Sequence, residues 1–121
     1  MRYQHVFIDA FGYELAPNVI SSAELEERLA PIYQRLNLRQ GQLQALTGIR
    51  ERRFWDPGES MHTGTIKAGR KALANSAVTP DDVGMLVYCG VCRDNMEPAT
   101  ACSVANGLGL TADTRVYDLS N

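Results

Sequence analysis

Hydrophobic residues recur at intervals of three and four between residues 23 and 37, which is the spacing of one buried face of a helix. The apolar positions are Leu25, Leu29, Ile32, Tyr33 and Leu36. Ser21 or Ser22 is suited to cap the start of this helix, because a serine hydroxyl accepts a hydrogen bond from a free backbone N–H group there. Pro31 lies inside the segment and lacks a backbone donor, so we expect it to kink the helix or divide it in two.

Three further segments have helical spacing. They are a short helix around residues 43–47 that ends at Gly48, a longer helix from Ser60 or Thr63 to about Ala77, and a helix from Ala99 to Leu108. The longer helix is rich in alanine and glycine, and these small side chains allow close packing against another backbone. The run Arg50–Arg53 lies between helices and is either a solvated edge or a surface that faces a ligand.

Three segments are expected to be strands: residues 5–14, which we expect to be buried over much of their length, Met85–Val91, and Arg115–Leu119. The second is apolar on both faces, which is typical of a parallel or mixed sheet covered by helices on both sides. The order of strand, helices, strand, helix and strand predicts a layered α/β domain. The last strand has no helix after it, so we expect the domain to continue beyond residues 1–121, within which no linker or repeat marks a boundary.

Composition and charge narrow the class of protein. The chain has 45% hydrophobic and 21% charged residues, as globular proteins do. A net charge of −2 argues against a nucleic-acid partner, which requires a basic face. No apolar run approaches the roughly 20 residues of a membrane span, and no signal peptide begins the sequence. A cytoplasmic location is therefore expected.

The three cysteines, Cys89, Cys92 and Cys102, do not suit a secreted disulfide framework, because their number is odd. Cys89 and Cys92 form a C-x-x-C pair, but within a predicted strand and not at a helix N-terminus, where a thiol is activated. Zinc would require two more ligands, and only Cys102, His5 and His62 are available, at no recognisable spacing. We expect no metal and interpret the cysteines as small buried thiols, with a redox protein as the alternative.

Four stretches together resemble the thiolase-fold condensing enzymes of the β-ketoacyl-ACP synthase III family. They are Thr47–Arg52, which is similar to a T-G-I-x-x-R segment, the alanine-rich helix Ala68–Ala77 with the following Asp81-Asp82 turn, the strand Met85–Val91, and Tyr117–Asn121. The resemblance covers essentially the whole chain. It implies that residues 1–121 are the N-terminal portion of a thiolase-like fold, layered α/β/α/β/α, with a mixed sheet covered by helices, and that they end just before the catalytic cysteine.

The same resemblance implies an acyltransferase whose main catalytic groups lie elsewhere. In the family a cysteine thiolate attacks an acyl thioester, and a histidine and an asparagine stabilise the oxygen and the enolate. His5, His62 and the three cysteines do not match those positions, so residues 1–121 alone are expected to be inactive. The implied substrates are acyl-CoA or acyl-ACP, with no cofactor. The implied partners are the remaining C-terminal portion of the synthase and a second subunit in a homodimer.

Two departures from typical synthase III enzymes refine the resemblance. Gln42 and Leu46 stand where the family has a tryptophan and an arginine that hold the coenzyme A adenine. Glu97 stands before Pro98, where the family has a phenylalanine at the mouth of the partner's acyl pocket. A carboxylate there resembles the OleA-type branch of long-chain olefin biosynthesis. It implies that Glu97 is a general base acting in the partner subunit, and that the neighbouring Met96 lines the acyl channel.

The implied reaction is a Claisen condensation of two long-chain acyl-CoA molecules without decarboxylation. Removing a proton from carbon requires a base, and a carboxylate among apolar acyl chains is a stronger base than it is in water. The alternative for Glu97 is a carboxylate that only complements the dipole of the helix beginning at Ala99. Arg93 and Asp94 are interpreted as structural residues that are able to pair across a dimer interface.

Two other functions remain open from the sequence. One is a synthase III of fatty acid or polyketide synthesis that uses a malonyl-ACP donor and generates its carbanion by losing carbon dioxide. The other belongs to a different class: a non-catalytic, dimerising half that pairs with a separate chain. The accepted acyl chain length is not encoded in any motif that we identify.

Overall fold

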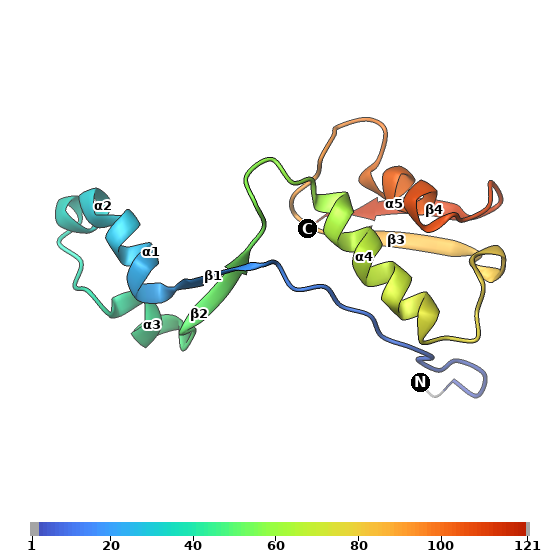
Figure 1. Ribbon diagram of the computed structural model, residues 1–121, viewed down its shortest axis with the longest axis horizontal. Helices are drawn as coiled ribbons and strands as arrows, with labels where there is room; N and C mark the ends of the chain where they lie inside the picture. The colour runs from blue at the N-terminus through green and yellow to red at the C-terminus, as the bar shows by residue number, and fades with distance from the viewer. Residues whose placement is uncertain (1–2, 121) are drawn as a thin grey trace. The chain divides into compact units, whose positions relative to one another are not determined.

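The computed structural model describes residues 3–120, which form two compact units (Figure 1). We call Leu15–Gly58 the hairpin unit, and the described residues on either side of it the sheet unit. Within the described part of the chain, no helix is both long and apolar enough to span a membrane. Each unit has its own strands, helices and buried residues.

Two short antiparallel strands frame the hairpin unit. Its elements are β1 (Asn18–Ser21), α1 (Ser22–Arg28), α2 (Ala30–Arg35), α3 (Gln42–Thr47) and β2 (Glu51–Phe54). The strands pair over four residues, from Asn18 opposite Phe54 to Ser21 opposite Glu51. The arginine run therefore forms most of a strand, and its Arg53 guanidinium donates to the Ala16 carbonyl oxygen at 3.1 Å.

The helix boundaries of the hairpin unit follow its polar and special residues. The Ser21 hydroxyl caps α1 by accepting the Glu24 N–H at 3.0 Å. α1 ends at Arg28 and α2 begins at Ala30, with Pro31 in the first turn of α2, so the predicted division of this helix is confirmed. Gly48 ends α3 in the left-handed conformation with φ of 69°, as its position in the sequence predicted.

A parallel pair of strands joined by a helix forms the centre of the sheet unit. Its elements are α4 (Met61–Ala74), a 3₁₀ turn η1 (Pro80–Asp82), β3 (Met85–Cys89), α5 (Thr100–Leu108) and β4 (Arg115–Leu119). The strands pair in parallel from Met85 opposite Arg115 to Cys89 opposite Leu119. The sequence predicted a parallel or mixed sheet for the strand Met85–Val91, and its pairing with β4 is parallel.

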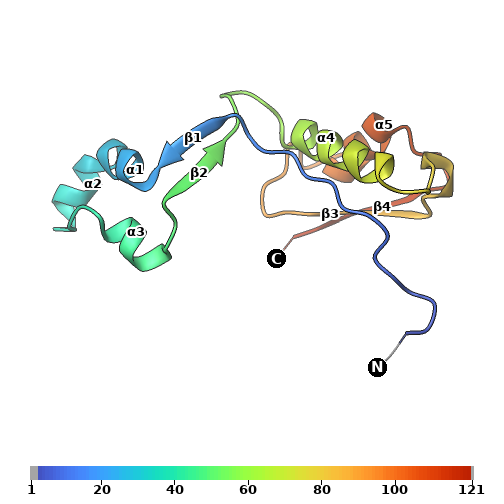
Figure 2. The same cartoon turned by 60° about the horizontal axis from the view of Figure 1, so that its bottom comes forward.

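The core of the sheet unit lies between the strands and the helices. Tyr88, Ala101 and Val104 are buried, and Leu86 and Val116 are among the partly buried residues that pack against them. Figure 2 shows α4 and α5 on the same side of β3 and β4. The residues alternate between the two faces along each strand, as β geometry requires.

The opposite face of this strand pair is uncovered within residues 3–120. Its exposed apolar side chains are Met85, Val87, Tyr117 and Leu119. The sequence predicted helices on both sides of the sheet, and the described residues supply them on one side. The arrangement of helices and strands is the predicted α/β class.

The segment 5–14 does not form the strand that the sequence predicted. It contains no assigned strand, and its apolar side chains, such as Phe7 and Phe11, are 80% and 76% exposed. The segment lies instead along α4, where a Cβ atom on Gly12 would be 2.2 Å from the Ala68 carbonyl oxygen. An ion pair of 2.6 Å between Glu14 and Lys71 of α4 attaches the C-terminal end of this segment to the helix. Apolar residues specify a strand only where a partner strand is available to take the backbone hydrogen bonds.

The cysteines are less buried than predicted. Cys89 and Cys92 are exposed, Cys102 is half-buried, and all three are free thiols. Cys89 lies on the uncovered face of β3 and Cys92 lies in the following loop, so the apolar character of their neighbours does not bury them here. The interpretation of all three as buried core thiols is therefore wrong for the described chain.

Candidate active-site loop

The loop from Gly90 to Ala99 connects β3 to α5 and carries both residues that the sequence singled out. Glu97 is exposed, and its carboxylate makes no hydrogen bond or ion pair with any of residues 3–120. Met96 is 88% exposed. The loop therefore exposes an unpaired carboxylate and, one position earlier in the sequence, a long apolar side chain.

Asp118 of β4 provides the carboxylate at the N-terminus of α5. Its two oxygens accept the backbone N–H groups of Thr100 and Ala101, both at 2.8 Å, and its side chain is 5% exposed. The first turn of α5 contains no acidic residue. The alternative for Glu97 was a carboxylate that only complements the dipole of this helix. The carboxylate that binds the first N–H groups of α5 is Asp118, and Glu97 takes no part in that helix's hydrogen bonding.

The start of the loop is held by the end of β4. The Arg93 guanidinium donates to the Ser120 hydroxyl from Nε at 3.0 Å and from Nη2 at 2.7 Å. That hydroxyl in turn donates to the Gly90 carbonyl oxygen at 3.2 Å. Arg93 also lies 4.0 Å from the Asp118 carboxylate. Arg93 therefore has its partners within the chain.

Asp94 ties the same loop to the N-terminus of α4. Its carboxylate accepts the Met61 N–H at 2.7 Å and the His62 N–H at 2.9 Å, and it lies 2.8 Å from Nδ1 of His62. Burial alone would raise the pKa of Asp94, but these N–H groups and the His62 ring hold that pKa below its ordinary value. Ser60, the residue before α4, makes no capping bond with its side chain, so Asp94 acts in its place.

Thr100, which begins α5, has a buried hydroxyl without a partner. The residue is 1% exposed, and its Oγ1 atom makes no hydrogen bond within the described residues. A buried hydroxyl without a partner costs free energy. The atom lies three residues after Glu97, at the point where the loop becomes helix.

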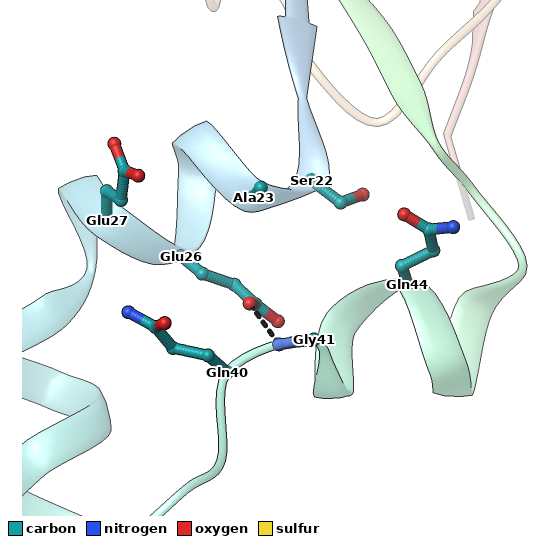
Figure 3. A pocket seen from close by; sticks show the side chains of 7 residues that line it. All are labelled: Ser22, Ala23, Glu26, Glu27, Gln40, Gly41 and Gln44. Carbon is teal, nitrogen blue, oxygen red and sulfur yellow. Dashed lines mark hydrogen bonds between the residues drawn. The ribbon is translucent and has the colours of Figure 1, made fainter.

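The two positions of the absent adenine clamp lie on α3 of the hairpin unit. Leu46 is 77% exposed, and the Gln42 side chain accepts the Arg39 N–H at 3.3 Å. A pocket of about 320 Å³ lies between α1 and the start of α3 (Figure 3). Two carboxylates line it. Glu27 is exposed, whereas Glu26 is 3% exposed and already accepts the N–H of Gly41, so Glu26 is not free to bind a ligand.

No metal centre is present among residues 3–120: no three histidine, cysteine, aspartate or glutamate side chains come together there. The C-x-x-C pair is exposed and is not joined by a disulfide.

Sequence reasoning missed the roles of Asp94 and Asp118. Asp94 was expected to be a structural residue, but its attachment to α4 was not foreseen. Asp118 was noted only as part of a motif. One signal could have identified it: it is the single charged residue among apolar neighbours near the end of β4, and a carboxylate in such a strand requires donors to compensate its burial.

The chain is similar along its length to known condensing enzymes. It is 53% identical over 121 residues to the acyl-CoA:acyl-CoA alkyltransferase of Shewanella oneidensis, covering 100% of this chain and 35% of that protein. It is 36% identical over 114 residues to a β-ketoacyl-[acyl-carrier-protein] synthase III of Deinococcus radiodurans, covering 93% of this chain and 31% of that protein. No protein-family model matches the chain.

The fold agrees with these similarities. A crystal structure of a Glu→Gln variant of Xanthomonas campestris OleA superimposes with a TM-score of 0.82 at 32% identity, covering 93% of this chain and 32% of that one. Crystal structures of the same protein with that glutamate replaced by aspartate or by alanine have also been solved. The chain spans about a third of the length of the curated relatives it matches.

Proposed function

This chain belongs to the thiolase-fold family that includes OleA and β-ketoacyl-ACP synthase III, and on that premise we propose that it supplies the general base of an acyl-CoA-condensing enzyme. The base is Glu97. The reaction is a head-to-head Claisen condensation of two long-chain acyl-CoA molecules without decarboxylation. The cysteine, histidine and asparagine of the family are not among residues 1–121, so this polypeptide by itself is expected to be inactive.

The proposed reaction is a proton transfer followed by an acyl transfer. Glu97 takes a proton from the carbon next to the thioester carbonyl of the second acyl-CoA, which becomes an enolate. The enolate carbon attacks the acyl group on the cysteine, a carbon–carbon bond forms, and the carbon–sulfur bond to the cysteine breaks. The cysteine leaves as a thiolate, and the product is a β-ketoacyl-CoA. Glu97 then returns its proton to solvent.

One observation carries this proposal: Glu97 is exposed and unpaired on a loop whose helix-capping role is filled by Asp118. A general base must reach its substrate with its lone pairs free. A carboxylate kept for structure would be expected to have donors, as Asp94 and Asp118 have. The 53% identity to an acyl-CoA:acyl-CoA alkyltransferase supports the choice of reaction.

Several parts of the proposal concern the assembled protein. Met96, which precedes Glu97 in the sequence and is 88% exposed, lines the acyl channel. Glu97 acts in the partner subunit of a homodimer, in the cytoplasm, and the remaining catalytic groups come from a C-terminal portion that follows this N-terminal portion of the domain. No cofactor enters this scheme, because Glu97 and the cysteine, histidine and asparagine of the family act directly on the two thioesters.

The decisive experiment uses the purified natural protein that contains this chain, with two fatty acyl-CoA substrates and no malonyl thioester. We expect Glu97→Ala to lower the rate of condensation by about 100- to 10,000-fold, the usual contribution of a general base. The rate at which the cysteine is acylated should not change. Glu27→Ala, which removes another exposed carboxylate far along the sequence, is the control. Condensation that persists in Glu97→Ala would show that the base assignment is wrong.

The second candidate is a malonyl-ACP-dependent synthase III, which the 36% identity to the Deinococcus radiodurans enzyme favours. Such an enzyme obtains its carbanion by decarboxylation and does not require a carboxylate base. The same assay separates the two functions. Product from malonyl-ACP but not from two acyl-CoA molecules would assign the protein to the second.

A further inference from the structure

The loop that carries Glu97 is fastened on both sides of a free tip. Before the tip, Asp94 accepts two backbone N–H groups from the start of α4. On the other side of the tip, the first two backbone N–H groups of α5 donate to the carboxylate of Asp118, which belongs to β4. The four tip residues, 95–98, make no side-chain hydrogen bond or ion pair with any described residue.

We propose that Asp94 and Asp118 are positioning residues that fix the place at which Glu97 is presented. This inference rests on the proposed role of Glu97 as the base. Glu97 is three residues from Asp94 and three from Thr100, so a fully extended chain allows it to move at most about 11 Å from either attachment. Two attachments of that length confine the carboxylate far more than one would.

The attachments are strong because each is charge-assisted and partly shielded from water. The bonds to Asp94 and Asp118 measure 2.7–2.9 Å, a length typical of N–H donors to a carboxylate. The two side chains are 15% and 5% exposed. A base held by such contacts approaches its substrate without first losing conformational freedom.

Both attachments lead into the same core. α4 contributes Ile66 and α5 contributes Val104 to the cluster around Tyr88. The two helices also touch at Gly107, where a Cβ atom would lie 2.2 Å from Cδ1 of Ile66. The two ends of the loop are therefore fixed to helices that cannot shift independently, which is the support that a functional residue on a loop requires.

The expected effect of loosening one attachment is a loss of condensation without a loss of acylation. A misplacement of about 1 Å costs about 100-fold in rate, so we expect Asp94→Asn to slow condensation by about 10- to 100-fold. Acylation of the cysteine should stay within twofold of the unmodified rate, because Glu97 takes no part in it. Asp118→Asn should have the same pattern. If that variant fails to fold, Asp94→Asn alone carries the test.

A matched control distinguishes positioning from general loss of a helix-capping carboxylate. Asp82, in the turn between α4 and β3, accepts the Thr79 N–H at 3.0 Å and the Thr79 hydroxyl at 2.6 Å. Asp82→Asn removes the same charge by the same chemical change. We expect it to leave the ratio of condensation to acylation unchanged. Amide hydrogen exchange of residues 95–97 should become faster in Asp94→Asn but not in Asp82→Asn.

A double-mutant cycle with Glu97→Gln completes the test in the natural protein. If Asp94 acts through Glu97, adding Asp94→Asn to Glu97→Gln slows condensation less than threefold further. If the rate losses of the two single variants multiply in the double variant, the positioning role is overturned. Equal losses of acylation and condensation in Asp94→Asn would overturn it too. An unchanged condensation rate in Glu97→Gln alone would instead remove the proposed base, and the inference with it.

Discussion

The Oε2 atom of Glu26 lies 2.5 Å from the backbone nitrogen of Gly41, so a carboxylate on α1 binds the residue immediately before α3. Oε1 of the same carboxylate accepts the Leu43 N–H at 2.7 Å and the Tyr33 hydroxyl at 3.1 Å (Figure 3 shows the bond to Gly41). One buried carboxylate thus joins three segments of the hairpin unit. The first N–H groups of a helix have no partner within it, and Glu26 supplies one from a distant part of the sequence.

Replacing Glu26 with glutamine is expected to destabilise the hairpin unit, because the amide loses the charge and turns a donor toward the backbone N–H groups. The melting temperature of the natural protein should fall by several degrees. Glu27→Gln is the matched control, since Glu27 is the exposed neighbour and lines the same pocket. Equal melting temperatures for the two variants would contradict the assigned role.

Stability should also depend on pH through Glu26. The N–H of Gly41, followed by that of Leu43, holds the pKa of Glu26 below its ordinary value. A lowered folded-state pKa means that the carboxylate contributes stability fully above about pH 4.3, the ordinary glutamate value, and that this contribution is lost as the pH falls through the folded-state pKa. Denaturant unfolding from pH 7 to pH 3 should show a steeper loss in the unmodified protein than in Glu26→Gln.

Gly12→Ala is expected to cost about 1–3 kcal/mol, the usual range for forcing an extra atom into a packed site. The new Cβ atom would lie 2.2 Å from the Ala68 carbonyl oxygen and 2.3 Å from the Ala72 nitrogen, and helix backbone cannot move aside. Gly84→Ala meets no atom within 4 Å and provides the control. Chemical denaturation measures both. A neutral Gly12→Ala would mean that the N-terminal segment does not press against α4.

Tyr88→Phe is expected to lower stability by about 0.5–1.5 kcal/mol, the net value of one hydrogen bond. The Tyr88 hydroxyl donates to the Cys92 carbonyl oxygen at 3.1 Å and so links the core to the start of the Glu97 loop. Burial, and then the charges of Asp94 and Asp118, raise the pKa of Tyr88, so the hydroxyl keeps its proton over the physiological range. Thermal unfolding with Tyr117→Phe, an exposed tyrosine on the other face, as the control checks the prediction.

Thr100→Val is expected to leave stability unchanged or to increase it. Valine has nearly the shape of threonine and removes a buried hydroxyl that has no partner among residues 3–120. Denaturant unfolding of the natural protein measures the difference. A loss of more than about 1 kcal/mol would show instead that a group outside the described residues binds this hydroxyl.

Local rules predicted those elements whose ends are set by single residues. Pro31 divided the first helix and Gly48 ended the third, because each acts on its own backbone. The apolar character of Met85–Val91 predicted a parallel or mixed sheet, and β3 pairs in parallel with β4, a partner that the sequence did not specify. The error at residues 5–14 arose because a strand needs a partner, and partners are decided by the whole chain. β1 was missed for the same reason, since its partner residues in β2 lie 30 to 36 positions away.

The candidate site was predicted in part. The sequence and the family resemblance identified the loop and Glu97 as a proposed base, a role that remains to be tested. They did not identify what holds the loop, because the bonds from Asp94 to α4 and from Asp118 to α5 join residues 32 and 18 positions apart. Contacts of that kind depend on how helices cross, which a pattern along one chain does not specify.

The bare face of β3 and β4 has a practical consequence for anyone who expresses residues 1–121 alone. Met85, Val87, Tyr117 and Leu119 present an apolar surface on a short two-stranded sheet that has unpaired edges within the described residues. Such surfaces bind hydrophobic dyes and attract other strands, so the isolated polypeptide should fluoresce with such a dye and form aggregates as its concentration rises. Introducing lysine at Val87, in the centre of that face, offers a simple way to keep it in solution for biophysical work.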